Sequence, residues 1–109
     1  MTQITFAGMA MTAKGHAGWG QYGQDVVCAG MSTLFAAVAE CMIAMEADGM
    51  LEGHADILLQ PGNVRLVMQP KARGREKAEA IWEVLTTGCQ MLANSYPQNI
   101  VMTAAEAAE

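Results

Sequence analysis

The sequence is short of positive charge. Six Lys and Arg residues stand against eleven Asp and Glu residues, so the formal net charge is −5 at pH 7. So few cations cannot form the broad counterion-releasing surface that binding to a nucleic-acid backbone requires, and we expect no direct nucleic-acid binding. The negative charge suits a basic partner, such as a cationic peptide tail, but only weakly, because many cytosolic domains are mildly acidic for solubility alone.

Cysteine and histidine are also scarce. The chain has three cysteines, and its two histidines are His16 and His54. No Cys-x-x-Cys pair occurs and neither histidine has a second ligand at metal spacing, so we expect no disulfide framework, no metal and no cofactor. A reducing cytoplasm is the simplest location. Cys41 and Cys89 fall on apolar helix stripes and are expected in the core, whereas His54 is expected at the surface.

Long apolar runs are missing as well. No uninterrupted run approaches the roughly 20 residues of a membrane span, and the N-terminus lacks the basic and apolar regions of a signal peptide. We therefore expect no membrane association. The 109 residues, 52% of them hydrophobic, fit a single domain over residues 1–109 with one core. The Ala/Glu tail at 104–109 is expected to fray.

The hydrophobic periodicity predicts seven elements in the order β-β-α-β-β-α-β. Two short strands, at 4–6 and 9–13, form a first hairpin. The segment Gln60-Pro61-Gly62-Asn63 fits a type II turn that joins a second pair of strands. Apolar stripes and flanking stop signals predict two helices, Pro97 ends the second of them, and a last strand follows. The remaining predicted ranges are strands 57–60, 64–68 and 99–103, and helices 26–47 and 74–95. This order predicts an α+β fold, a small and mostly antiparallel sheet with two helices packed on it.

The segment between His16 and Cys28 is the most informative part of the chain. His16 opens a glycine-rich loop, and Cys28 lies where an apolar helix begins. Unsatisfied N–H groups in a first helical turn, together with the helix dipole, favour a thiolate and lower the pKa of a thiol. A nearby imidazole can take the thiol proton. The two residues therefore predict a cysteine nucleophile. Position alone leaves open that Cys28 is a core residue and His16 an exposed loop residue.

Four neighbouring residues have two interpretations each. Asp25 either caps the helix or orients His16. Ser32, one helical turn after Cys28, either contacts the nucleophile or the substrate, or bonds back to the helix carbonyls. Trp19 and Tyr22 are large aromatic residues inside the glycine-rich loop, where they either cover a peptide groove or dock onto the sheet.

A longer motif connects these residues. Gly15-His16-Ala17-Gly18, followed by Tyr22-Gly23-Gln24-Asp25-Val26-Val27-Cys28-Ala29-Gly30-Met31-Ser32, resembles the motif of the bacterial ribosomal-processing cysteine protease family. The order of the later elements is similar too, so the resemblance covers nearly the whole chain. It implies an endopeptidase that removes a short N-terminal extension from a large-subunit ribosomal protein, the equivalent of bacterial protein twenty-seven of that subunit.

The resemblance also implies roles for individual residues. Cys28 matches the nucleophile and His16 the base, while Gly15, Asp25 and Ser32 match supporting residues. Family members resemble homodimers with a mobile loop over the site, which here comprises Gly18, Trp19, Gly20, Tyr22 and Gly23.

Three alternatives to this function stay open. Relatives also occur in phage genomes, where a capsid or scaffold precursor is the expected target. The segment before Gly15 is shorter than usual in the family, and Trp19 stands where Tyr is common, which leaves open a non-catalytic peptide-binding module of the same fold. A thiol redox protein is a weaker alternative, because no resolving cysteine lies close to Cys28 in sequence.

Overall fold

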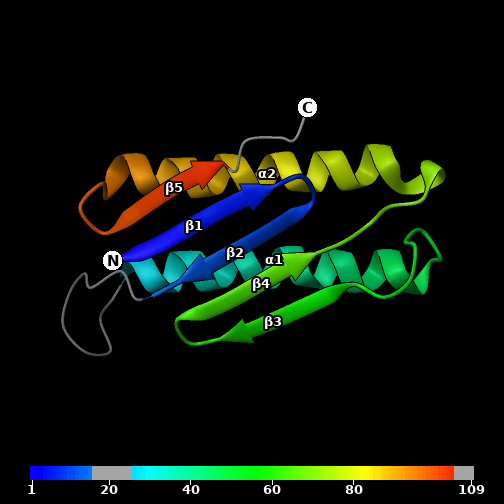
Figure 1. Ribbon diagram of the computed structural model, residues 1–109, viewed down its shortest axis with the longest axis horizontal. Helices are drawn as coiled ribbons and strands as arrows, with labels where there is room; N and C mark the ends of the chain where they lie inside the picture. Colours follow the sequence, from blue (N-terminus) through cyan, green and yellow to red (C-terminus); the bar gives the residue numbers. More distant parts are fainter. Residues whose placement is uncertain (16–25, 105–109) are drawn as a thin grey trace.

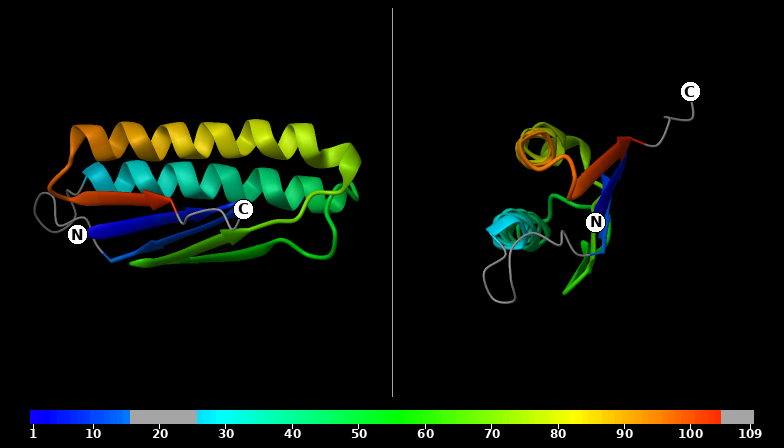
Figure 2. Two further views of the ribbon diagram at one scale, coloured as in Figure 1. Left: turned by 45° about the horizontal axis from the view of Figure 1, so that its top comes forward. Right: turned by 90° about the vertical axis from the view of Figure 1, so that its left-hand side faces the viewer.

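The computed structural model describes residues 1–15 and 26–104, which form two layers, a sheet and a pair of helices (Figure 1). Both helices cover the same face of the sheet, as the end-on view in Figure 2 shows. The predicted element order is confirmed. The elements are β1 (Thr2–Ala7), β2 (Ala10–Lys14), α1 (Val26–Ala47), β3 (Asp56–Gln60), β4 (Asn63–Val67), the short 3₁₀ helix η1 (Ala72–Gly74), α2 (Arg75–Ser95) and β5 (Ile100–Ala104).

The sheet is mostly antiparallel, as predicted. Its strand order is β3-β4-β2-β1-β5, and only the β1–β5 pair is parallel. In the β3–β4 hairpin, Gly62 has a φ of 72°, the left-handed conformation that the second central position of a type II turn requires. Ala104 is a correction to the predicted frayed tail, since it ends β5 opposite Phe6. Residues 105–109 lie outside the described residues.

The core lies between the sheet and the helices. Alternate strand residues point toward the helices, so Ile4, Met11 and Leu66 are fully buried. Methionines fill much of the remaining space, as predicted, because their unbranched side chains adapt to irregular gaps. The opposite face of the sheet is polar: Arg65 makes a two-point ion pair with Asp56, with nitrogen–oxygen distances of 2.9 and 3.1 Å. One face of the sheet is therefore covered and the other meets solvent.

The two helices differ in how apolar residues are distributed around them. In α2 the buried residues form one stripe, Ala78, Trp82, Leu85 and Cys89, as predicted. In α1 the apolar residues occur on every side, and Ile43 is 51% exposed. The prediction that Cys41 lies in the core is wrong, because Cys41 is exposed. Spacing alone cannot select the buried face of a helix that is apolar all round.

By length and composition α1 is the one described helix that could cross a membrane. This is weak evidence for a span, since the core helix of a soluble protein passes the same test. Seven residues of α1 are buried in the core, among them Val27, Phe35 and Met42. The expectation of no membrane association stays a prediction.

The last turn of α1 is tied to the chain that leads into β3. The two oxygens of Glu46 accept hydrogen bonds from the backbone N–H of Ala55 at 2.6 Å and pair with Nδ1 of His54 at 3.0 Å. His54 is exposed, as predicted, but its partner was not foreseen. The hydrogen bond and the charge of Glu46 raise the pKa of His54, and the hydrogen bonds from His54 and Ala55 lower the pKa of Glu46.

This pair predicts a pH-dependent contribution to stability. Because the pKa of His54 is raised in the folded state, its contribution to stability is complete below pH 6.5, its ordinary pKa, and is lost as the pH rises through the folded-state pKa. The pKa of Glu46 is lowered, so its contribution to stability is present above pH 4.5, its ordinary pKa, and is lost as the pH falls through the folded-state pKa. The free energy of unfolding should therefore fall more on His54→Ala at about pH 5.5 than at about pH 8. Urea unfolding at both pH values measures this difference. An equal loss at the two pH values would contradict the pairing.

Candidate active site

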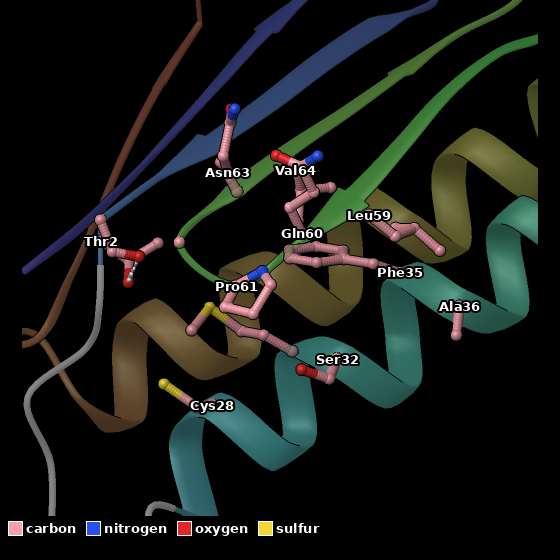
Figure 3. A pocket seen from close by; sticks show the side chains of 14 residues that line it. Thr2, Cys28, Ser32, Phe35, Ala36, Leu59, Gln60, Pro61, Asn63 and Val64 are labelled. Atoms are coloured by element: carbon pink, nitrogen blue, oxygen red, sulfur yellow. Dashed lines mark hydrogen bonds between the residues drawn. The ribbon is translucent and has the colours of Figure 1, made fainter.

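A pocket of about 420 Å³ opens between the first half of α1 and the β3–β4 hairpin (Figure 3). Three parts of the chain form its walls: the start of β1 together with the end of β2 and the residue after it, one face of α1, and the β3–β4 turn with the residues beside it. The lining residues are, in that order, Thr2, Ala13 and Gly15; Cys28, Met31, Ser32, Phe35 and Ala36; and Leu59, Gln60, Pro61, Gly62, Asn63 and Val64.

Cys28 lies in the first turn of α1, as the sequence predicts. The helix begins at Val26, which makes Cys28 its third residue, and the half-buried side chain points into the pocket (Figure 3). The N–H groups of a first turn have no carbonyl partner within the helix, and the helix dipole adds a partial positive charge. Both stabilise a thiolate at this position, and the same N–H groups can stabilise an oxyanion.

Ser32 lines the same pocket one turn further along α1 (Figure 3). The back-bond to a helix carbonyl that was considered for Ser32 is made by the neighbouring Thr33, whose hydroxyl donates to the carbonyl of Ala29 at 3.0 Å. Ser32 is exposed in the pocket wall, within reach of whatever fills the pocket.

Gly15 is fixed in the pocket wall from three sides. Its N–H donates to the carbonyl of Gly62 at 2.9 Å, and its own carbonyl accepts a bond from the hydroxyl of Thr2 at 3.3 Å. Its φ is 94°, and a Cβ at this position would collide with the carbonyl oxygen of Met1. Only glycine fits this corner without strain. The chain thus reaches residue 16 directly from a rigid point of the pocket that contains Cys28.

The remaining predicted site residues lie outside the described residues. These are His16, Gly18, Trp19, Gly20, Tyr22, Gly23 and Asp25. The structure therefore places Gly15, Cys28 and Ser32 around one pocket, and the roles assigned to all the predicted site residues stay predictions.

Sequence reasoning missed the apolar walls of the pocket. Phe35 lies seven residues after Cys28, on the same helix face, so helical spacing alone could have found it. Leu59 and Pro61 come from the hairpin, and nothing local in the sequence shows that the hairpin lies opposite Cys28. The register between β2 and β4 brings it there, since Ala13 is paired with Val64.

The other two cysteines have environments unlike that of Cys28. Cys89 is fully buried, and burial raises the pKa of its thiol to about 12. Cys41 is exposed, and none of the three, all of them described, forms a disulfide. Within residues 1–15 and 26–104, no three His, Cys, Asp or Glu side chains are grouped so as to hold a metal ion.

The chain matches one protein-family model and several solved structures. The model of the family described as cysteine protease Prp matches residues 1–101. A comparison with curated proteins finds no significant match. Among solved structures, the Staphylococcus aureus ribosomal processing protease Prp with a covalently linked product peptide has a TM-score of 0.72 and 23% identity, over 95% of this chain and 97% of the other.

Two further structures are similar. The same S. aureus protease with a substrate peptide has a TM-score of 0.65 at 22% identity, again over 95% of this chain and 97% of the other. The Streptococcus mutans protein SMU.848 has a TM-score of 0.63 at 22% identity, over 94% of this chain and 90% of the other. At these identities the likeness establishes a shared fold.

The close contact at Gly15 predicts an unusual sensitivity to an added methyl group. Gly53 is the matched control, because its φ is 71° and a Cβ there would meet nothing within 4 Å. Gly53→Ala should cost about 1–2 kcal/mol for the left-handed backbone alone. Gly15→Ala should cost at least about 1 kcal/mol more, since the carbonyl of Met1 must move as well. Urea unfolding of both variants tests this, and equal costs would contradict the described contact.

Proposed function

The chain belongs to the Prp family of cysteine proteases, whose model matches residues 1–101, and from this premise we propose that it removes a short N-terminal extension from the precursor of a large-subunit ribosomal protein. The family is that of the predicted resemblance, and it makes the chain a cysteine protease. One observation carries the finer proposal: Cys28, in the first turn of α1, shares an apolar pocket with Gly15, and His16 is the next residue after Gly15.

The proposed chemistry uses a dyad of Cys28 and His16. His16 takes the thiol proton, and the thiolate attacks the carbonyl carbon of the scissile peptide bond. N–H groups in the first turn of α1 stabilise the resulting oxyanion. The peptide bond then breaks, His16 gives its proton to the departing amine, and a thioester on Cys28 remains. Water, deprotonated by His16, hydrolyses the thioester and releases the second product and the thiol.

The supporting residues receive roles consistent with this chemistry. Asp25 orients His16 or caps α1, and Ser32 contacts the substrate beside Cys28. The loop residues Gly18, Trp19, Gly20, Tyr22 and Gly23 are proposed to lie over the bound peptide.

The pocket and the net charge bear on the substrate. Met31, Phe35 and Leu59 give the pocket apolar walls, which favour a substrate with an apolar side chain near the scissile bond. A net charge of −5 favours the approach of a basic protein, and ribosomal proteins as a class are basic. We further propose that the protein acts in the cytoplasm as a homodimer. A phage capsid or scaffold precursor is the alternative substrate for the same chemistry.

Removing the nucleophile or the base should abolish turnover. Cys28→Ala and His16→Ala should each lower kcat/KM on a ribosomal precursor by at least about a thousandfold, with the unfolding midpoint nearly unchanged. Cys41→Ala is the matched control, since it removes an exposed thiol from the same helix and should keep full activity. Mass spectrometry of the cleaved precursor measures turnover. Full activity in Cys28→Ala would overturn the dyad, and cleavage of a capsid precursor alone would change the substrate.

The three thiols should also differ in reactivity. Alkylation by iodoacetamide follows the thiolate, so Cys28 should react at lower pH than Cys41 if the helix and an imidazole stabilise its ionised form. Cys89 should react only on unfolding, because it is buried and its pKa is raised to about 12. Peptide mapping of the labelled protein from about pH 5 to 9 gives the three profiles. An inert Cys28 in a protein that binds peptide tightly would favour the non-catalytic module.

A further inference from the structure

Strand β3 forms one edge of the sheet, and this edge borders the pocket. Within the described ranges β3 pairs with β4 alone. An edge strand presents a row of N–H and C=O groups that can pair with a further strand. Leu59 and Gln60, at the end of β3, line the pocket that contains Cys28.

Two hydrogen bonds fix which groups of β4 face β2. The N–H of Gly15 donates to the carbonyl of Gly62 at 2.9 Å, and the N–H of Met68 donates to the carbonyl of Met9 at 3.1 Å. Both belong to the same antiparallel ladder, in which successive residues turn their backbone groups to opposite sides. The even-numbered residues of β4 therefore face β2, and the odd-numbered ones face β3.

The register then assigns the backbone groups of β3. The odd-numbered residues Asn63, Arg65 and Val67 are paired with Gln60, Leu58 and Asp56, respectively. Those three residues of β3 direct their backbone groups toward β4. The two residues between them, Ile57 and Leu59, direct N–H and C=O toward the open edge.

The side chains of Ile57 and Leu59 lie on the helix-facing side of the sheet. Their cross-strand partners are the buried Leu66 and the pocket residue Val64. Leu59 is 45% exposed, and Figure 3 shows it at the end of the pocket next to Ala36, away from Cys28. The edge that offers unpaired backbone groups thus also forms one side of the pocket mouth.

We propose that the peptide substrate binds in an extended conformation along the edge of β3, pairs with the backbone of Ile57 and Leu59, and so adds a sixth strand to the sheet. This inference rests on the proposed function, because it assigns the binding mode of the peptide that Cys28 cleaves. The recognised chemistry is an unfolded, extended segment of polypeptide, since only a backbone in that conformation matches donors and acceptors on alternate residues.

This binding mode has a consequence for the substrate sequence. Alternate side chains of the bound strand turn toward α1 and enter the pocket against Phe35 and Leu59, and those between them turn to the outer face. Selectivity should therefore fall on every second residue of the bound segment. Its other residues should be replaceable, because the main chain supplies the rest of the binding.

Proline at an outward-facing position provides a first test. Proline lacks the N–H, and a sheet edge tolerates it where that N–H would face outward. The substrate is a synthetic peptide that spans the cleavage site of the ribosomal precursor. The kcat/KM of Leu59→Pro for this peptide should be at least about tenfold lower than that of Leu59→Ala. Leu59→Ala is the control because it also loses the side chain but keeps the backbone N–H. Ile57→Pro and Ile57→Ala form a second matched pair. Circular dichroism and thermal unfolding check that all four variants fold.

Hydrogen exchange provides a second test that needs no turnover. In Cys28→Ala protein saturated with the same peptide, the amides of Ile57 and Leu59 should exchange at least about tenfold more slowly than without peptide. Those of Leu58 and Gln60, which already face β4, serve as internal controls and should change little. Residue-resolved NMR measures all four amides.

The outcomes separate this inference from the proposed function. Cleavage of the peptide with unchanged exchange at Ile57 and Leu59, or with equal activity in the Pro and Ala variants, would overturn the edge-binding mode and leave the protease intact. Protection of the two amides without cleavage by the unmodified protein would overturn the proposed function alone. Protection that rises with protein concentration and needs no peptide would show a second copy of this chain on the edge, which also overturns the inference.

Discussion

The corner at Gly15 is the constraint on which the pocket depends. Three parts of the chain converge there: the N-terminal residues Met1 and Thr2, the end of β2, and the hairpin turn at Gly62. The left-handed backbone and the missing side chain of Gly15 allow this convergence. Because two hydrogen bonds and a close backbone contact hold the corner, the chain enters residue 16 from a fixed position beside the pocket. The proposed base, His16, is therefore the next residue in the chain after a corner fixed to the sheet, while the proposed nucleophile, Cys28, belongs to helix α1.

Helix α1 serves the core and the pocket with different parts of the same segment. Apolar residues along α1 pack against the sheet and α2, and seven residues of α1 are buried. Its first turn carries Cys28, where the helix supplies N–H groups and a partial positive charge. The packing that stabilises the helix thus also holds the electrostatic environment of the thiol in place.

The sequence predicts the order of the elements and most of their limits, because the hydrophobic periods and turn residues are local signals. It also predicts the positions of Cys28 and Ser32 on one helical face, which follows from helical spacing. It fails where the outcome depends on packing between distant segments. Cys41 was expected in the core and is exposed, since α1 is apolar on all sides. The hairpin wall of the pocket and the pairing of His54 with Glu46 require the tertiary arrangement, which no local pattern specifies.

The parallel pairing of β1 with β5 has a consequence for how the protein folds during synthesis. The N–H of Thr2 donates to the carbonyl of Asn99 at 2.8 Å, and β1 is flanked by β5 along its length. Contacts between residues so far apart in sequence form late in folding, because the intervening chain must close a large loop. On a translating ribosome β1 lacks this neighbour until the segment after Asn99 has left the exit tunnel. Thr2, which holds Gly15, then gains its own anchor, so the pocket is completed only after β5 has paired with β1.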